Sequence, residues 1–272
     1  MGGVNFAMRP ANVGAFYGMP GWLVALFFLG LMVAASEIGY RMGLRSRAAE
    51  KTQALVPIIT GSILGLLGLL LGFTMSMSVS RYDARRRLVL EEANAIRVAY
   101  LRIQPLAPPE STELQDLLRQ YASNRLRVSQ SALDVSKLQQ GKEEDARLQS
   151  KLWSRAAALA RKEPQSLPAG LLMESLNAVF ELENSRWVGF IAHVPAEVIY
   201  VNALMGLVVA LMVGYEFGVT RQRHPLSQVL LIVSITMVMV LIIELDQPYS
   251  GAIRVSLQPL IDLQGQLAAP ML

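Results

Sequence analysis

Four stretches of the chain are almost entirely apolar and long enough to cross a lipid bilayer, which takes about 20 residues. They are residues 21–40, 54–80, 196–219 and 226–245. The second stretch contains no charged residue, and a helix in a soluble core does not require so long an uncharged run. The pattern therefore predicts an all-α membrane protein with four transmembrane helices, rather than four buried helices of one soluble domain.

The first apolar stretch is expected to stay in the protein as a helix. It is longer than the apolar region of a signal peptide, and only Arg9 precedes it. Four spans place both termini and residues 81–195 on one side of the membrane. The predicted organisation is a tail, two spans, an extramembrane bundle, two spans and a second tail: 1–20, 21–80, 81–195, 196–245 and 246–272.

The second span is expected to continue out of the bilayer as one helix. Apolar positions beyond it follow alternating steps of three and four residues, the seam of a packed helix. At 1.5 Å per residue, residues 54–104 form a rod of about 75 Å, of which about 35 Å lies beyond the bilayer. Pro105 ends it. The seam residues are Val79, Tyr82, Arg86, Val89, Ala93, Ile96, Tyr100 and Ile103.

Three more helices are predicted to return the chain to the membrane and complete a four-helix bundle. The first starts near Ser111, which suits an N-cap, and Gly141 is interpreted as the turn that follows it. The second covers about 143–162 and the third about 171–192, with a turn between them. The charged side chains of residues 142–145 are expected to be solvated.

Composition argues against several functions. The chain is 53% hydrophobic and contains no cysteine, which excludes a disulfide-stapled scaffold and thiolate metal sites. A formal net charge of +4 gives nucleic-acid binding no support. No catalytic motif is present, and the two histidines, His193 and His224, fall on opposite sides of the membrane. We therefore expect no enzymatic activity, cofactor or metal; the lipid bilayer is the first expected partner.

The second span carries a face of small residues and, beside it, larger apolar residues. The small residues recur at steps of three and four and allow close helix packing, within one subunit or between subunits. The alternative is that this span lines a pore whose apolar neck gates by dewetting. The small face is Gly61, Gly65, Gly68, Gly72, Ser76 and Ser80, and the neck would be Ile63, Leu66, Leu70 and Phe73.

Acidic residues within the spans are costly unless they are paired or hydrated. Glu37 and Glu216 lie near the short loops, and an i,i+4 pair of Glu37 with Arg41 is the simplest explanation of the first. A second layer lies at the bundle side. It is either an interfacial salt-bridge network or the charged mouth of a pore: Arg81, Asp83, Arg85, Glu244, Asp246 and Arg254.

Orientation in the membrane stays open. Cations concentrate in the short loops 41–53 and 220–225, which favours a cytoplasmic location for those loops and an external bundle. Arg81, Arg85, Arg86 and Arg87, directly after the second span, favour the opposite orientation.

Two segments resemble a known family. The string LLLGFTMSMSVSRYDARRRLVLEEANAIRVAYLR (69–102) is similar to the signature of the bestrophin-like domain family of bacterial membrane proteins, through Gly72-Phe73, Arg81–Arg86 and Glu92–Ala95. The segment 245–263 resembles the family's closing motif. Its matching residues are Asp246, Pro248, Gly251, Arg254, Val255, Gln258 and Pro259.

The resemblance implies a multi-pass protein of the bacterial inner membrane. Bestrophins are pentameric ion channels whose second span lines the pore and whose helical domain is cytosolic, so it also implies a homo-oligomer that conducts inorganic ions. No acidic cluster like the bestrophin calcium clasp is present, so calcium gating is not implied. We expect a channel subunit with a slight preference for cations. The alternatives are a non-conducting scaffold or sensor whose bundle binds a protein and, less favoured, a small-molecule transporter.

Overall fold

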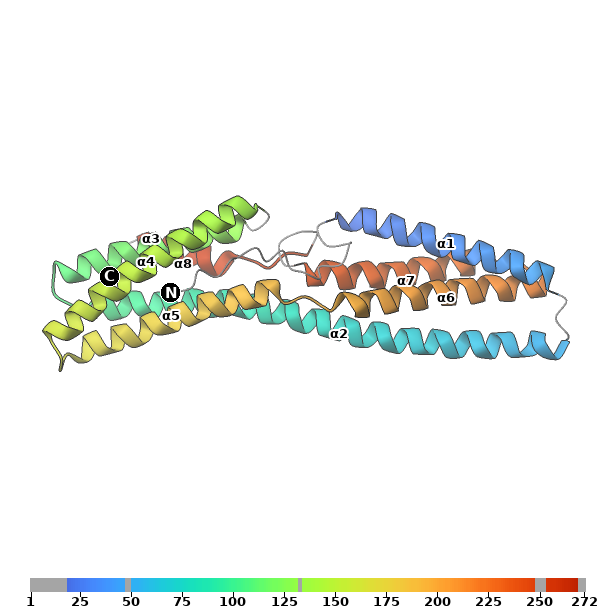
Figure 1. Cartoon of the computed structure of the whole chain (residues 1–272), viewed down its shortest axis with the longest axis horizontal. Coiled ribbons are helices and arrows are strands. Elements are labelled where there is room, and N and C mark those ends of the chain that lie inside the picture. Colours follow the sequence, from blue (N-terminus) through green and yellow to red (C-terminus); the bar gives the residue numbers. More distant parts are fainter. Residues whose placement is uncertain (1–18, 47–49, 132–133, 248–252, 269–272) are drawn as a thin grey trace, which may run out of the picture. The chain divides into compact units, whose positions relative to one another are not determined.

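The computed structural model describes residues 19–46, 50–131, 134–247 and 253–268. Every regular element within these ranges is an α-helix, which confirms the predicted fold class. Figure 1 shows the helices in sequence colours. They are α1 (Gly21–Arg45), α2 (Glu50–Ile103), α3 (Glu110–Gln130), α4 (Val135–Lys162), α5 (Leu167–Ile191), α6 (Ala196–Thr220), α7 (Pro225–Asp246) and α8 (Gln258–Ala268).

The chain divides into two compact units. The first, which we call the span unit, comprises residues 1–82 and 193–254, and the second, the bundle unit, comprises 83–192 and 255–272. Helix α2 belongs to both and is unbroken from Glu50 to Ile103, with Pro57 in its first turns. This confirms the predicted continuous helix. Prolines at 105, 108 and 109 follow its end and cannot donate the next intrahelical hydrogen bonds.

Four segments of the described residues are long and apolar enough to cross a membrane. They are Gly21–Arg45, Ala54–Ile103, Leu167–Thr220 and Pro225–Asp246, with mean hydropathies of 1.9, 2.3, 2.1 and 2.7 in their most apolar windows. Large apolar side chains on these helices point away from the rest of the chain. Phe27, Leu204 and Met237, for example, are 51%, 61% and 70% exposed. Such a surface is suited to lipid rather than water.

Helices α1 and α6 cross closely because both carry glycine pairs, in the sequences GYRMG (39–43) and GYEFG (214–218). A Cβ atom at Gly39 would collide with the backbone of Leu211, and one at Gly214 with the backbone of Ser36. A Cβ at Gly43 would meet Gly218 itself. The small residues therefore bring two backbones into contact. The two helices run in the same direction and end side by side (Figure 1).

Helix α7 and the inner side of α2 complete the core of the span unit. Phe28 and Met32 of α1, Leu67 of α2, Val209 of α6 and Met239 of α7 are each at most 2% exposed and belong to one apolar cluster. This cluster orients α2 so that the side bearing Leu67 faces its own chain. On the other sides of the span of α2, most side chains are exposed in the part of the chain that the structure describes.

The bundle unit contains the second half of α2, helices α3 to α5, and α8. The seam of α2 is confirmed from Val89 to Ile103, where all five apolar seam residues are buried. Val79 is 37% exposed and Arg86 is exposed, so the seam does not extend to them; Arg85 is buried instead. The C-terminal segment, expected to be a tail, forms helix α8. It packs on α3, and Arg119 Nε donates to the Leu267 carbonyl at 2.9 Å.

The interpretation of Gly141 as a turn is wrong, because Gly141 lies inside α4. The break falls earlier, where Asp134 caps α4 by accepting hydrogen bonds from the amides of Ser136 and Lys137 at 3.1 and 3.2 Å. Gly141 serves helix packing instead, since a Cβ atom there would collide with Val128 of α3. Ser111 is likewise not the N-cap of α3: the helix begins at Glu110, with Pro109 in the capping position.

Candidate functional site

The small-residue face of α2 has no partner within the described chain. A Cβ atom added at Gly61, Gly65, Gly68 or Gly72 would meet nothing within 4 Å. Ser76 and Ser80 on the same side are exposed. These glycines therefore do not serve helix packing within the subunit, in contrast to those of α1 and α6. Close packing between subunits and the lining of a pore both remain compatible with this face.

The four residues predicted to form an apolar neck divide into two pairs. Leu66 and Phe73 are 49% and 66% exposed and point away from the chain's own core. Ile63 and Leu70 are half-buried, and Ile63 packs against the core of the span unit. Leu69, which the sequence analysis did not select, is 56% exposed and lies one turn before Phe73. The exposed apolar positions nearest the centre of the span are thus Leu66, Leu69 and Phe73.

The inner side of α2 becomes polar toward the end of the span. Asn202 Nδ2 of α6 donates to Thr74 Oγ1 at 2.8 Å and to the Val198 carbonyl at 2.9 Å. Ser78 Oγ, Asn202 Oδ1 and Arg81 Nε are buried without a hydrogen-bond partner among the described residues. Arg81 as a whole is half-buried. Polar contacts therefore join α2 to α6 where the spans approach the boundary between the units.

The residues proposed for a charged mouth fall in both units. In the span unit, Glu244 is 9% exposed, and its carboxylate lies so close to Gly21 that a Cβ there would collide with it. Gly21 is the first residue of α1, where unpaired amides and the helix dipole favour a negative charge. The carboxylate of Glu244 thus stabilises the N-terminus of α1.

Asp246 is fully buried at the end of α7 and fixes the segment that leads into α6. Its Oδ2 accepts a hydrogen bond from the Val194 amide at 3.0 Å and lies 3.3 Å from His193 Nδ1. Arg254, also in the span unit, is exposed, and its carbonyl lies 3.4 Å from the Tyr82 hydroxyl. Glu244 and Asp246 therefore contact the segments at which α1 and α6 begin, whereas Arg254 is exposed.

Two of the mouth residues belong to the bundle unit. Arg85 is 6% exposed and donates to the carbonyls of Gly189 and Ala192 at 3.0 and 2.6 Å, which caps the end of α5. Asp83 is exposed. A cation at a helix C-terminus satisfies unpaired carbonyls and complements the dipole, so Arg85 has a structural role in addition to any role in conduction.

Of the intramembrane acids, Glu37 is paired as expected. Its Oε1 lies 2.9 Å from Arg41 Nε, which confirms the i,i+4 pair, and its Oε2 lies 3.2 Å from Arg223 Nη2. The Arg223 guanidinium also stacks over the Tyr40 ring, 3.8 Å from its centre. Glu216 is half-buried one turn before the end of α6. Among the described residues, no cation forms an ion pair with its carboxylate.

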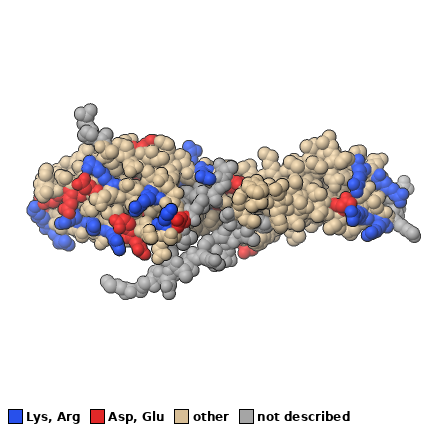
Figure 2. Space-filling view, turned by 90° about the horizontal axis from the view of Figure 1, so that it is seen from above, with Lys and Arg blue, Asp and Glu red and all other residues tan. Residues whose placement is uncertain are grey.

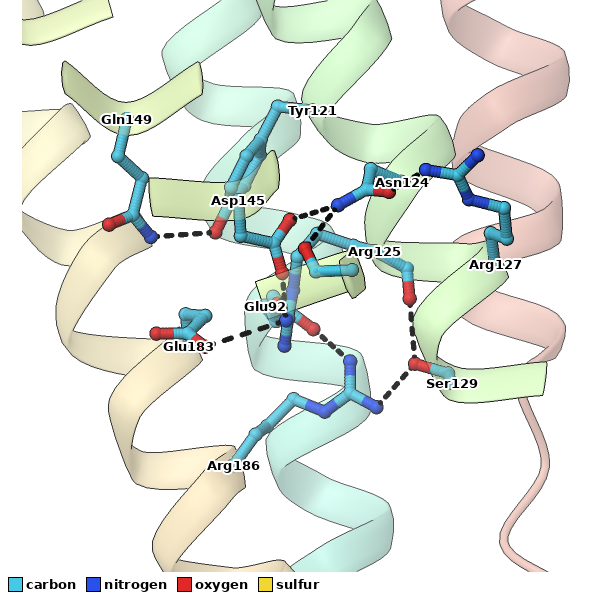
Figure 3. Close-up of polar contacts among 11 residues, drawn as sticks. Glu92, Tyr121, Asn124, Arg125, Arg127, Ser129, Asp145, Gln149, Glu183 and Arg186 are labelled. Carbon is cyan, nitrogen blue, oxygen red and sulfur yellow. Dashed lines mark hydrogen bonds and ion pairs between the residues drawn. The ribbon is translucent and has the colours of Figure 1, made fainter. Parts of the chain in front are cut away.

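A buried charge network that the sequence analysis did not identify joins four helices of the bundle (Figure 3). Arg125 of α3 is central: its Nε donates to Glu92 Oε1 at 2.6 Å and its Nη1 to Asp145 Oδ2 at 2.7 Å. Glu183 Oε1 lies 3.6 Å from the same Nη1. Arg186 pairs with the second oxygen of Glu92. Arg125, Glu92, Asp145 and Arg186 are all at most 8% exposed.

Neighbouring polar groups complete the hydrogen bonding of this network. Asn124 Nδ2 donates to Asp145 Oδ1 and to the Gly141 carbonyl, each at 2.8 Å, and Arg186 Nη2 donates to Ser129 Oγ at 3.0 Å. Burial raises the pKa of the Asp145 carboxyl. Burial lowers the pKa of the Arg125 guanidinium, but the surrounding acidic groups, of which Glu92 contributes most, together outweigh burial and raise that pKa.

The expectation that residues 142–145 are solvated is wrong for two of them. Asp145 is 2% exposed and belongs to the buried network. Lys142 is half-buried, its Nζ lies 3.2 Å from the centre of the Trp187 ring, and burial lowers the pKa of its ammonium group. The sequence contained a signal for the burial of Asp145. Asp145 lies three residues before Leu148, the first apolar residue of the α4 seam, and therefore on the same face of the helix.

The described residues contain no group of three or more side chains placed to hold a metal ion. The fold and these sites define a multi-pass helical membrane protein whose second span is open along an uncharged side and continues into a charge-stabilised bundle. The model of the bestrophin-like domain family matches residues 24–260, and the chain belongs to this family. Pro248 and Gly251 of the family's closing motif lie outside the described residues.

Solved structures support the same fold. A variant of a bacterial bestrophin homologue from Klebsiella pneumoniae superposes with a TM-score of 0.65 at 17% identity, covering 89% of this chain and 97% of the other. A second structure of that homologue gives a TM-score of 0.61 at 18% identity, covering 90% and 98%. The crystal structure of a membrane protein variant gives a TM-score of 0.63 at 18% identity, covering 89% of this chain and 97% of the other. No curated protein matches the sequence.

Proposed function

We propose that the chain is one subunit of a homo-oligomeric ion channel of the inner membrane, with α2 lining the pore. The observation that carries this proposal is the open side of α2. The uncharged span of α2 presents four glycines at which an added Cβ would meet nothing among the described residues, together with exposed large apolar residues. Neighbouring copies packed around an axis would cover such a face and enclose a narrow apolar passage. The resemblance to bestrophins supports the same arrangement, with a pentamer as the expected stoichiometry.

The constriction would be formed by the neck residues. Leu66 and Phe73 are the most exposed of the four predicted neck residues, and Leu69 is added to them because it is exposed to a similar extent. Ile63 and Leu70, half-buried at the edge of this face, would support the ring rather than close it. Such a ring excludes water when narrow and therefore acts as a gate. Asp83 and Arg254, both exposed, are the mouth residues best placed to meet a passing ion.

We continue to predict a slight preference for cations, and Glu216 is now the acidic residue on which this prediction depends. Glu37 has two arginine partners, so its charge is locally balanced. Glu216 is half-buried and adds a negative charge near one end of the spans. Arg81 and its neighbours at the other end, and the exposed arginines at the end that carries Glu216, would oppose this preference and favour anions. Reversal potentials in a salt gradient, for the natural protein and for Glu216→Gln, measure the preference directly.

The channel proposal is tested with purified protein in planar bilayers. We expect unitary currents that increase in Phe73→Ala, because removal of the ring widens and wets the constriction. The matched control is Met237→Ala, which removes a similarly exposed apolar side chain from α7 and should leave the current unchanged. Absence of current over a range of voltages and salts, together with a monomeric mass in detergent, would rule the proposal out.

One observation favours the alternative of a non-conducting scaffold or sensor. Apolar side chains of the bundle unit are exposed on α5, with Leu167, Val188 and Ile191 at 71%, 54% and 41%. A protein partner bound to the bundle would cover them. Copurification of one stoichiometric partner through residues 105–192, with no ion flux in liposomes, would favour this function over conduction.

A further inference from the structure

Four arginines gather at one end of the span unit. Arg41 and Arg45 lie in the last two turns of α1, and Arg221 and Arg223 lie in the turn between α6 and α7. All four are exposed. The glycine crossing of α1 and α6 makes these helices end together, which brings the two pairs to the same end (Figure 2). We call these four residues the cationic rim.

The rim is held in a defined conformation. Arg223 is fixed by Glu37 and by the Tyr40 ring, and Tyr215 donates from its hydroxyl to Ser46 Oγ at 3.1 Å, just beyond α1. Arg221 ends α6 in the left-handed backbone region, with φ 54°. Non-glycine residues rarely adopt that region. The backbone of the turn is thus held in a defined conformation, and the side chain of Arg223 has little freedom left to lose on binding.

The positive charge of the rim exceeds what its surroundings neutralise. Glu37 is shared by Arg41 and Arg223, whereas Arg45 and Arg221 have no acidic partner among the described residues. Among the residues whose side chains the structure describes at this end, and with Glu216 included, the four arginines of the rim are accompanied by two carboxylates. The helix dipoles do not account for the excess. The C-termini of α1 and α6 favour cations, but α7 begins at this end too, and its N-terminus has the opposite preference.

We propose that the cationic rim binds the phosphate groups of anionic lipids in the leaflet that meets this end of the spans. The four arginines lie at the ends of apolar helices, at the depth where headgroups lie, and guanidinium groups bind phosphate through two hydrogen bonds at once. Clusters of four to eight cations at the cytoplasmic end of a membrane helix have this preference, and the charge of the short loops 41–53 and 220–225 favours that location for the rim. Arg45 and Arg221 would provide most of this binding, because no carboxylate among the described residues pairs with them. The inference does not depend on whether the protein conducts ions.

The test uses the full chain in micelles with equal amounts of phosphatidylglycerol and phosphatidylcholine, and the retained lipid is counted by native mass spectrometry. We expect preferential retention of phosphatidylglycerol that weakens as salt increases. In Arg45→Gln/Arg221→Gln the preference should fall roughly tenfold or more. The control is Lys151→Gln/Arg161→Gln, which removes two exposed cations from the bundle and should keep the full preference.

A second arm separates lipid phosphate from free phosphate. In phosphatidylcholine vesicles, inorganic phosphate should leave the melting temperature unchanged, whereas added phosphatidylglycerol should raise it for the natural protein but not for the rim variant. Equal retention of both lipids, or equal loss in the rim and control variants, overturns the proposal. So does stabilisation by inorganic phosphate alone, which would indicate a site for free anions. A rim variant that melts lower by the same amount in both lipids would also overturn it, because the arginines would then only stabilise helix ends.

Discussion

Glu92 and Arg125 form a buried ion pair between α2 and α3, with Glu92 Oε1 2.6 Å from Arg125 Nε. The second oxygen of Glu92 pairs with Arg186 of α5. A single carboxylate thus joins three helices of the bundle. Because Glu92 is fully buried, water cannot take the place of its carboxylate as a partner for either arginine.

Glu92→Gln should therefore destabilise the bundle strongly. The amide keeps the shape but leaves two buried guanidinium groups short of a negative charge, which typically costs about 3–5 kcal/mol. Thermal and denaturant unfolding in detergent measures the change. The control is Glu174→Gln, which breaks the exposed pair with Arg102, 3.2 Å long, and should cost about 1 kcal/mol or less. Equal losses in the two variants would contradict a structural role for the network.

The spans and the long helix were predictable because their signals are local. Uncharged runs identify helices in lipid, and the prolines from Pro105 onward end α2 whatever surrounds it. The closing helix α8 was not predicted, because its three buried leucines acquire a function only when α3 is beside them: Leu260, Leu263 and Leu267.

The buried network escaped prediction for a similar reason. Arg125 occupies a seam position of α3, four residues after Tyr121 and three before Val128. A charge on a seam indicates a buried partner, but the sequence does not say which of the many acids supplies it. Arg186 lies on the seam of α5 in the same way, seven residues after Val179. Charged seam positions on several helices, considered together, would have indicated a shared polar core.

Gly214→Leu should separate α1 from α6. Its first added atom would overlap the Ser36 backbone, which cannot move aside without shifting the helix. We expect a loss of about 2–3 kcal/mol in the unfolding of the separated monomer, as for other overpacked contacts. Gly68→Leu makes the same change on the open side of α2 and should leave the monomer within about 0.5 kcal/mol of the natural protein. Its effect should appear in the mass of the oligomer. The reverse ranking in the monomer would refute the assigned packing.

Acid should loosen the start of α4. Hydrogen bonds from Ser136 and Lys137 lower the pKa of Asp134 to about 2, below its ordinary 3.8. A lowered folded-state pKa gives stability that is present above pH 4 or so and is lost as the pH falls toward 2. Amide-exchange protection of Ser136 and Lys137 should therefore decrease over that interval. Asp134→Asn keeps an acceptor without titrating, so its protection should stay level. A parallel decrease in the variant would assign the effect to other groups.

Asp246→Ala should weaken the connection that leads into α6. The buried Val194 amide would lose its acceptor, which lies 3.0 Å away, and an unsatisfied buried donor costs about 1–3 kcal/mol. Asp246→Asn offers an oxygen at the same place, so it should recover most of that loss in thermal unfolding. The control is Asp262→Ala, which removes an exposed carboxylate that accepts a hydrogen bond from Gln258 of α8 at 2.8 Å and should change stability by less than about 0.5 kcal/mol. If Asp246→Asn unfolds as easily as Asp246→Ala, the negative charge beside His193, rather than the hydrogen bond to Val194, holds this segment in place.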